Sequence, residues 1–355
     1  VVDTARGEIL KKKDVMARLV GRRPYGEWVR THMVRLHEPP PRDGHEDEDL
    51  AGVDLGQIQT AFACTNEDIR MIIRTMASQG HEPVFSMGDD IPLAVLSQMH
   101  RPLPFYFRQR FAQVTNPPID PLREELVMSL DCYLGPRGSV FEETPEHARV
   151  VHLASPLLSA GTLEALRRLE GFPSRQISLL FPVARGPQGL EEALERICRE
   201  ASQAVDEGCT ILILSDRGVD SQHAAVPALL AVGAVHHHLI REGKRMKTDI
   251  VVETGSAWDV HHFALLLGYG ANGIYPYLAL ATLRSFLEER GVEEGDMEEL
   301  LANFRQAVER GLLKIMSKMG ISALRSYRGA QIFEIIGLSQ EVVDRYFTGT
   351  PARLG

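Results

Sequence analysis

The stretch Ile211-Leu212-Ile213-Leu214 is wholly apolar and ends at once in the polar sequence Ser215-Asp216-Arg217-Gly218. A strand that is apolar on both faces is typical of a parallel sheet covered by helices on both sides. This stretch belongs to a series of short apolar runs at residues 150–154, 177–181, 210–214, 249–252 and 273–275. Helical periodicity fills the intervals between the runs, at residues 162–169, 189–206, 227–241 and 257–267. The alternation predicts at least five consecutive β–α units.

These units predict an α/β fold, either a (β/α) barrel or an open doubly wound sheet. Eight clean units cannot be counted, so we expect an incomplete or degenerate barrel-like parallel sheet. Extra helices are expected on its N-terminal side and at its C-terminal end. The runs at 177–181, 210–214 and 249–252 are expected to lie side by side and parallel. The sequences that join them are helix-forming and long enough for right-handed crossovers.

The start of the chain predicts helices and a polar connection. Residues 1–37 indicate a short strand and two helical stretches with basic faces. Pro39-Pro40-Pro41 ends them, because proline lacks a backbone N–H and disfavours helix before it. Residues 42–49 are polar and mostly acidic and indicate an exposed linker.

The next helix has a recognisable start. Thr65 and Asp68 have the three-residue spacing of a capping box. The apolar residues that follow repeat at helical spacing and are expected to face the core: Ile69, Ile72, Ile73 and Met76. Two further helices are predicted at residues 104–114 and 121–133. The segment between them, 115–121, holds three prolines and cannot be helical.

The composition places the chain among ordinary globular proteins. It has 355 residues, of which 44% are hydrophobic and 25% charged, and its net charge is −9. A nucleic-acid binder needs a basic face, and a membrane span needs about 20 consecutive apolar residues, so neither function is expected. The few scattered cysteines fit a reducing compartment, and we expect a cytoplasmic protein: Cys64, Cys132, Cys198 and Cys209.

Two carboxylates follow predicted strands and are candidates for acid/base chemistry. Asp216 comes directly after one apolar run and Glu253 after another, where parallel sheets carry their functional loops. Structural roles are the alternative. Asp216 would then pair with Arg217 or cap a turn, and Ser256 would cap the next helix with Asp259 at its third position.

Histidines and glycines gather in places but do not form a metal or nucleotide motif. The histidines are adjacent rather than four residues apart on a helix, so surface and core positions are favoured over a metal site: His236, His237, His238, His261 and His262. Gly268, Gly270 and Gly273 have the spacing of a dinucleotide-binding loop but precede a strand instead of following one. No metal ligand is therefore assigned.

Longer stretches of the chain resemble one family. The resemblance is to the central domain of the glutamate synthase large subunit, and it covers almost the whole chain. It is carried by Val84-Phe85-Ser86-Met87-Gly88-Asp89-Asp90, by Val114-Thr115-Asn116-Pro117-Pro118-Ile119-Asp120-Pro121, by Ile211-Leu212-Ile213-Leu214-Ser215-Asp216-Arg217, and by Ser326-Tyr327-Arg328-Gly329-Ala330-Gln331-Ile332-Phe333-Glu334.

The resemblance implies a parent enzyme of several modules. Such an enzyme takes the amide nitrogen of glutamine as ammonia, adds it to 2-oxoglutarate and reduces the imine to glutamate. The chain would be an excised piece: residues 1–50 the tail of a glutaminase module with a linker, 51–325 the central domain, and 326–355 a connector toward a flavin-binding barrel. The family's central domain resembles a degenerate copy of that barrel. The other modules of the same polypeptide would be its partners.

The chain departs from the catalytic modules of that enzyme. It lacks the N-terminal cysteine of the glutaminase and the closely spaced cysteines of the iron–sulfur cluster, and residues 215–218 lack the flavin barrel's glycine-rich phosphate loop. We therefore assign no catalytic, cofactor-binding or metal-binding residue, and expect FMN and the cluster outside this chain. The expected function is a scaffold that couples ammonia release to glutamate formation. The alternative is an independent α/β-barrel enzyme that uses Asp216 and Glu253 on a phosphorylated or carboxylated small molecule.

The stiff segment at 115–121 is the candidate for the ammonia path or an interdomain contact. Its polar and proline residues suit a fixed wall: Thr115, Asn116, Pro117, Pro118 and Asp120. The structural alternative is a plain start of the next helix, with Glu124 and Glu125 in its first turn complementing the helix dipole.

Overall fold

A four-stranded parallel sheet lies at the centre of the molecule. The computed structural model describes residues 1–36, 54–83, 96–98, 101–110, 116–288 and 294–354. The strand order is β12-β11-β9-β7, and the strands run over Ala271–Tyr275, Asp249–Glu253, Ile211–Ser215 and Ser174–Ser178. All three pairings are parallel, with Val251 opposite Ile213. The predicted side-by-side arrangement is confirmed.

One strand differs from its predicted bounds. The apolar run 177–181 divides between two sheets. β7 ends at Ser178, and β8 (Leu180–Pro182) pairs antiparallel with β10 (His223–Ala225). At the break, the Leu179 N–H donates to the Ser215 carbonyl over 2.8 Å, which turns the chain from one sheet to the other.

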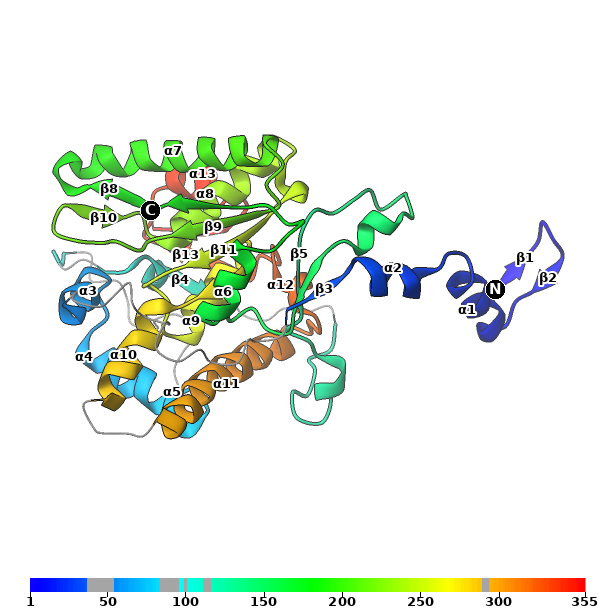
Figure 1. Cartoon of the computed structure of the whole chain (residues 1–355), viewed down its shortest axis with the longest axis horizontal. Coiled ribbons are helices and arrows are strands. Elements are labelled where there is room, and N and C mark those ends of the chain that lie inside the picture. Colours follow the sequence, from blue (N-terminus) through cyan, green and yellow to red (C-terminus); the bar gives the residue numbers. More distant parts are fainter. Residues whose placement is uncertain (37–53, 84–95, 99–100, 111–115, 289–293, 355) are drawn as a thin grey trace.

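Helices cover both faces of the sheet, as apolar strands require. Figure 1 shows α7 (Gly186–Asp206) and α8 (Ala228–Arg241) on one side and α10 (Tyr277–Glu288) and α11 (Glu294–Lys318) on the other. Between them, α6 (Ala160–Arg167) and α9 (Val260–Gly268) connect the strands. α7 buries one face and exposes the other, whereas α8 and α9 are buried on almost all sides. The core therefore lies around α8, α9 and the sheet.

The sheet does not close into a barrel in the part of the chain that the structure describes. β6 (Val151–Leu153) pairs with β3 (Val34–Arg35) and β5 (Cys132–Leu134) in a separate sheet. Just after β6 the chain meets the edge of the central sheet, where Leu157 bridges Ile274 in parallel. This partial continuation past β12 is the incomplete barrel-like arrangement that the sequence predicts.

Both helices predicted between residues 104 and 133 are wrong. A short 3₁₀-helix at Leu103–Tyr106 leads into β4 (Phe107–Gln109), which pairs with β13 (Phe333–Ile336), itself flanked by β14 (Ala352–Arg353). The second stretch holds a 3₁₀-helix at Glu125–Val127 and then β5. Residues 111–115 lie outside the described residues. Pairing with a strand more than 200 residues later outweighs the local helical pattern, because it buries Phe107 completely against Tyr269 and Phe347.

The helix predicted from Thr65 is confirmed with its cap. The Thr65 hydroxyl accepts from the Asp68 N–H, and the Asp68 carboxylate accepts from the Thr65 N–H. α4 (Asn66–Asp68), a π-helical turn (Ile69–Ile73) and α5 (Arg74–Gln79) follow as one continuous element. Ile73 and Met76 are fully buried, while Ile69 and Ile72 pack partly buried against the core.

Three short helices complete the body. α3 (Leu55–Ala61) begins at Asp54, whose carboxylate accepts from the Gly56 N–H over 2.9 Å. α12 (Leu324–Tyr327) and α13 (Gln340–Tyr346) flank β13. None of the helices in the described ranges is long and apolar enough to cross a membrane.

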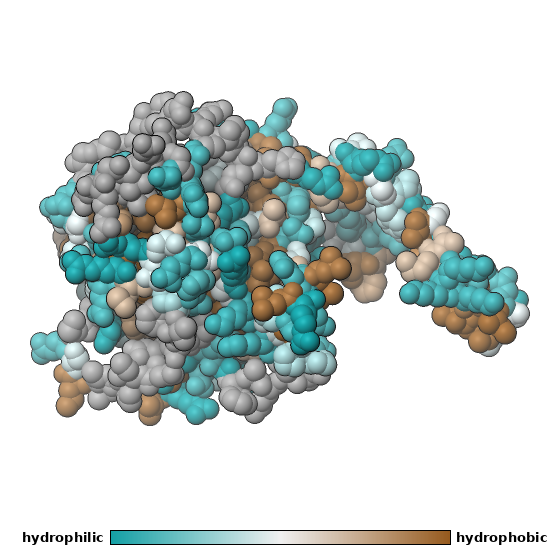
Figure 2. Space-filling view, turned by 90° about the horizontal axis from the view of Figure 1, so that it is seen from below, coloured by the Kyte–Doolittle hydropathy of each residue, from teal (hydrophilic) through white to brown (hydrophobic). Residues whose placement is uncertain are grey.

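The N-terminal residues form an arm that projects from this body (Figure 1). It consists of the hairpin β1 (Val2–Asp3) and β2 (Glu8–Ile9), then α1 (Lys12–Val20) and α2 (Tyr25–His32). Neither helix of the arm buries a residue. Figure 2 shows an apolar patch at its tip. The exposed apolar residues of the arm are Val1, Val2, Ile9, Met16, Leu19 and Val20.

Candidate functional site

The two carboxylates singled out in the sequence meet at the carboxyl edge of the sheet. Glu253 ends β11 directly opposite Ser215, the last residue of β9, and Asp216 follows at the next position. Parallel pairing brings them together, because the carboxyl ends of neighbouring strands lie at one edge. Glu253 is 1% exposed and Asp216 fully buried, so the site is closed to solvent.

Asp216 is held by neutral donors. Its carboxylate accepts from the Gly255 N–H over 2.9 Å, from the Thr254 hydroxyl and from the hydroxyl of Tyr277. Burial raises the pKa of Asp216 to about 7, because the hydrogen bonds only partly offset the loss of water around the charge. Burial also raises the pKa of Tyr277, so that its hydroxyl stays a donor.

Glu253 forms ion pairs with two nearby guanidinium groups, those of Arg167 and Arg217. Arg217 Nε donates to Oε1 over 2.6 Å, and Arg167 Nη2 donates to Oε2 over 2.8 Å. The Ser215 hydroxyl adds a third donor at 2.7 Å. Arg217 also lies over the ring of Tyr277, 4.4 Å from its centroid. Both oxygens of Glu253 are therefore fully engaged.

The structural roles considered for these residues are partly right: Asp216 ties a turn, but it does not pair with Arg217. Asp216 ties the turn at Thr254 and Gly255, whereas Arg217 pairs with Glu253 instead of with Asp216. The predicted cap of the next helix is also wrong. Asp259, not Ser256, is the N-cap of α9, and its carboxylate accepts from the His261 N–H. The two carboxylates are brought together, but their partners are other groups of the chain, which favours support of the fold over acid/base chemistry.

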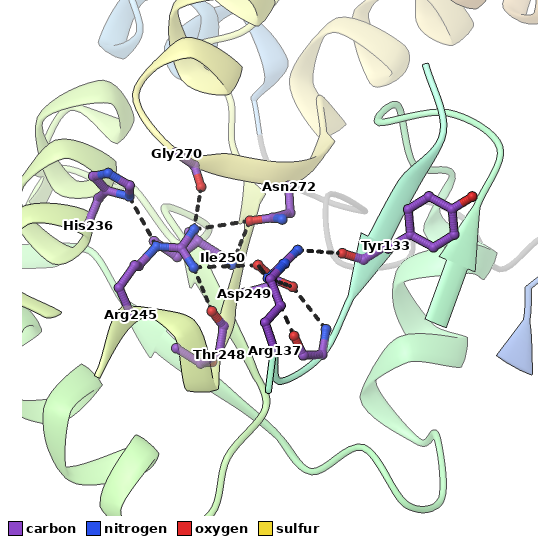
Figure 3. A network of polar contacts seen from close by, with 10 residues as sticks. Tyr133, Arg137, His236, Arg245, Thr248, Asp249, Ile250, Gly270 and Asn272 are labelled. Carbon is purple, nitrogen blue, oxygen red and sulfur yellow. Dashed lines mark hydrogen bonds and ion pairs between the residues drawn. The ribbon is translucent and has the colours of Figure 1, made fainter. Parts of the chain in front are cut away.

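A second buried carboxylate cluster, at the amino edge of the same sheet, was not anticipated from the sequence (Figure 3). Asp249 begins β11 and is completely buried. Arg137 Nη1 donates to both its oxygens, over 2.8 and 2.9 Å, and the Gly135 N–H donates over 2.9 Å. Arg245 approaches from the other side at 3.4 Å. No local pattern joins these residues, since Arg137 and Asp249 are 112 positions apart.

Arg245 fastens this cluster to its surroundings. Its guanidinium donates to the Thr248 carbonyl over 2.6 Å, to the Gly270 carbonyl over 2.9 Å and to His236 Nδ1 over 3.0 Å. Burial and the neighbouring guanidinium lower the pKa of His236 to about 3, so the ring is a neutral acceptor. A Cβ at Gly270 would lie 2.5 Å from His236 Nδ1, and its φ is +120°, so this position requires glycine. The spacing that suggested a nucleotide loop serves packing here.

The remaining histidines also have structural partners. His261 Nε2 donates to the carbonyls of Phe107 and Pro104, over 3.1 and 3.2 Å, which holds β4 against α9. His238 pairs with Glu242 at 3.2 Å. Among the described residues, no three histidine, cysteine or carboxylate side chains are grouped as a metal ion would require.

The proline-rich segment lies on the surface beside the end of α11. Thr115 lies outside the described residues, and Asn116, Pro117 and Pro118 are exposed. The Ile119 N–H donates to the Ser317 carbonyl over 2.9 Å. Gly320, with a φ of +66°, approaches so closely that a Cβ there would lie 2.9 Å from the Pro117 carbonyl oxygen. The segment is thus fixed to the body along one side.

Asp120 organises the turn after these prolines. Its carboxylate accepts from the N–H groups of Leu122 and Arg123, over 2.9 and 3.0 Å, and from Arg123 Nε over 2.7 Å. These bonds, the Arg123 N–H first, lower the pKa of Asp120 to about 2. Glu124 accepts from the Asp120 N–H over 2.8 Å. The expected helix start at Glu124 and Glu125 is wrong, because this turn replaces it.

The cysteines and the loop after β9 do not fit the two cofactors that the sequence resemblance implies, an iron–sulfur cluster and FMN. All four cysteines are free thiols, and burial raises the pKa of Cys64 and Cys132 to about 12, which disfavours the thiolate that an iron–sulfur cluster needs. At the loop after β9, Arg217 is already paired and Asp216 would place a carboxyl against a phosphate. The cysteines therefore do not fit an iron–sulfur cluster, and the loop after β9 does not fit the phosphate of FMN.

Comparison with known proteins identifies the family. A family model described as the glutamate synthase central domain matches residues 57–339. The ferredoxin-dependent glutamate synthase of Pyropia yezoensis is 45% identical over 369 residues, which cover 100% of this chain and 24% of that protein. The NADPH glutamate synthase large chain of Bacillus subtilis is 41% identical, again over 100% of this chain and 23% of its own length. The chain thus spans about a quarter of the curated relatives it matches.

Solved structures resemble the chain only distantly. The flavin-binding domain of baker's yeast flavocytochrome b2 is 14% identical and covers 44% of this chain and 39% of its own, with a TM-score of 0.30. That likeness is too weak to carry an argument. The sequence relatives and the family model agree over residues 57–339, and the chain belongs to the glutamate synthase central domain family.

Proposed function

We propose that the chain is the central scaffold of a glutamate synthase and couples ammonia release from glutamine to reductive glutamate formation from 2-oxoglutarate. Membership of the central domain family carries this proposal. The closed carboxylate cluster of Asp216 and Glu253 supports it further, because their oxygens are engaged within the chain. The reacting groups, FMN and the iron–sulfur cluster would then come from other modules of the polypeptide.

The shape of the chain supports the first of the proposed module boundaries. The arm buries no residue of α1 or α2 within this chain, which supports assigning residues 1–50 to the preceding glutaminase module and its linker. Residues 51–325 form the central module. Residues 326–355 lead toward the flavin barrel, and they also complete the core here, since Phe333 and Phe347 are buried.

Exposed apolar residues beside the proline-rich segment support an interdomain contact there. Leu122 is 85% exposed in the turn that the Asp120 carboxylate organises, and Leu126, in the 3₁₀-helix that follows, is 98% exposed. Large apolar groups on a fixed loop are typical of a surface that another module covers. Free ammonia is largely protonated in neutral water, so an enclosed path between modules has a chemical rationale. Thr115, Asn116, Pro117, Pro118 and Asp120 would form part of its wall.

The test of coupling uses the full-length enzyme that contains this chain. In the Asn116→Leu variant, we expect more glutamine hydrolysed per glutamate formed from 2-oxoglutarate, while ammonia production stays measurable. Gln203→Leu, on the exposed face of α7, is the matched control and should keep the wild-type ratio. An unchanged ratio and rate in folded Asn116→Leu enzyme would return Asn116 to a purely structural role.

The chain alone offers a second test. We expect the purified 355-residue chain to release no glutamate from glutamine and to support no 2-oxoglutarate-dependent oxidation of a reduced dye. We also expect it to be colourless, because neither the loop after β9 nor the cysteines fit a cofactor. Turnover above background, or a yellow protein with a flavin spectrum, would contradict the proposed division of labour between modules.

A further inference from the structure

A large apolar cavity opens at the carboxyl edge of the sheet, apart from the Asp216–Glu253 cluster. Its volume is about 700 Å³, and its walls come from the antiparallel pair β8 and β10, the first turn of α8, the inner face of α9 and the 3₁₀-helix at Leu103–Tyr106. The apolar wall includes Phe181, Val226, Leu229, Trp258, Leu265 and Leu266. The volume falls within the roughly 300–1,000 Å³ of small-molecule sites, and this edge is where α/β folds hold ligands.

The first turn of α8 presents unpaired backbone donors to this cavity. Pro227 is the N-cap and provides no side-chain bond, and the first intrahelical bond runs from the Ala231 N–H to the Pro227 carbonyl over 3.0 Å. The N–H groups of Ala228, Leu229 and Leu230 therefore have no partner in the described part of the chain. All three residues line the cavity. Free N–H groups at the positive end of a 14-residue helix favour an anion.

His262 adds a side-chain donor from the opposite wall. It is 6% exposed, lines the cavity and packs edge-on against Trp258. Its Nδ1 accepts a long hydrogen bond from the Trp258 N–H, at 3.5 Å, which favours the tautomer with the ring proton on Nε2. Within the described ranges Nε2 has no hydrogen-bond partner. Because His262 lines the cavity, a ligand bound there would supply the partner for this donor.

We propose that the cavity binds an amphipathic carboxylate, with the carboxylate between the N-terminus of α8 and His262 Nε2 and the apolar body against Trp258, Leu265 and Leu266. This goes beyond the proposed coupling function, which needs no ligand in this domain. Backbone N–H groups and a neutral histidine donor suit a single carboxylate better than a multiply charged phosphate. Arg101 at the cavity's rim adds positive charge. Asp220, also at the rim, is engaged by the N–H groups of Gln222 and His223.

The chain carries its own reporter for this site. It has two tryptophans, Trp28 in the arm and Trp258 in the cavity wall. In a Trp28→Phe background, decanoate at neutral pH should change Trp258 fluorescence in a saturable way. Decanol, which has the same chain without the charge, should bind at least about tenfold more weakly, because a hydrogen-bonded charge adds roughly that much affinity. Decylamine, with the opposite charge, should bind more weakly still.

Three variants locate the carboxylate. His262→Phe keeps a flat ring and removes the donor, and should weaken decanoate about tenfold while leaving decanol unchanged. Ala228→Pro removes one N–H at a position where proline suits a helix, and Pro227, with ψ of 126°, already has the conformation required before proline. It should weaken decanoate severalfold and spare decanol. His237→Phe, on the same helix but outside the cavity, is the control and should change neither.

Two results would overturn the proposal. Equal binding of decanoate and decanol in the parent chain, unchanged in His262→Phe and Ala228→Pro, would mean that no carboxylate site exists. No saturable change with any of the three probes, in a chain whose circular dichroism shows it folded, would mean that a side chain of another module fills the cavity instead. Should His262→Phe fail to fold, Ala228→Pro decides alone.

Discussion

Strand β11 carries a buried carboxylate at each end, Asp249 and Glu253, and the arginines around the two ends are distributed differently. At the amino edge, Asp249 meets two guanidinium groups, from Arg137 and Arg245. At the carboxyl edge, Glu253 takes both arginines and leaves Asp216 with hydroxyl and amide donors. Burial therefore dominates at Asp216 and raises its pKa to about 7. Depth alone does not set the charge state of a buried acid; the distribution of cations around it does.

The comparison also separates support from function. The amino edge of a parallel sheet serves stability, and the Asp249 cluster fits that role. The carboxyl edge of a parallel sheet holds the active site in many enzymes. Here its two acids, Asp216 and Glu253, are buried and accept hydrogen bonds from other groups of the chain. The apolar cavity beside them is the open feature of this edge.

The largest expected effect is at Asp249. Replacing it in Asp249→Ala leaves Arg137 and Arg245 without their shared counter-charge, which should cost about 3–5 kcal/mol of the free energy of unfolding. Urea unfolding of the 355-residue chain measures this. Asp206→Ala removes a surface partner of Lys244 and should stay near wild type. Equal losses in the two variants would show that the network in Figure 3 does not stabilise the fold.

A smaller loss is expected at the other end of β11. Glu253→Gln removes the charge that Arg217 and Arg167 share, yet Arg167 is 31% exposed and regains water. We expect a loss of about 2 kcal/mol, less than for Asp249→Ala, because the amide oxygen of the introduced side chain still accepts a hydrogen bond from an arginine, whereas Asp249→Ala removes both acceptor oxygens. The same urea experiment ranks the two variants. The reverse order would show that the Asp249 network is not the stronger of the two.

We expect the titration of Asp216 to make the free energy of unfolding depend on pH. Its pKa is raised in the folded chain above the ordinary 3.8, so between about pH 4 and 7 the folded state holds a proton that the unfolded state has lost. Stability from this group is present below that window and falls as the pH rises through it, by at most about 1.4 kcal/mol per pH unit.

Asp216→Asn removes this titration and isolates it from other groups. We therefore expect the free energy of unfolding of the variant, relative to that of wild type, to be higher at pH 8 than at pH 5. The amide oxygen of the introduced side chain is still an acceptor for the Gly255 N–H, so the fold should persist. A difference that is constant between pH 5 and 8 would show that Asp216 does not take up a proton in this range.

The smallest effect is expected at Asp120, a partly exposed carboxylate that also accepts from an arginine and from backbone N–H groups. Arg123→Ala removes the side-chain donor to Asp120, but the N–H groups of Leu122 and of residue 123 remain. The pKa of Asp120 should stay below its usual value, and the midpoint of urea unfolding should not change measurably. NMR titration of the Asp120 carboxyl measures its pKa. A return of that pKa to an ordinary value would show that the arginine, not the turn, sets it.

Much of this molecule is determined by the sequence by itself. The apolar run at β9 and β11, the amphipathic pattern of α7 and the capping box at Thr65 each specify a structure within a few residues, because the hydrogen bonds and burial concerned are local. The order of the parallel strands follows too, since helical connections of that length leave few alternatives.

The tertiary structure alone decided the rest. Residues 107–109 become a strand because β13 lies beside them, and Arg137 meets Asp249 because two sheets meet at that point. The same holds for two of the partners of Asp216, Thr254 and Gly255, which come from a loop 38 and 39 positions later. A local pattern shows which residues can be buried or charged. Which charges share a buried site depends on contacts between distant parts of the chain, and those contacts exist only once the chain has folded.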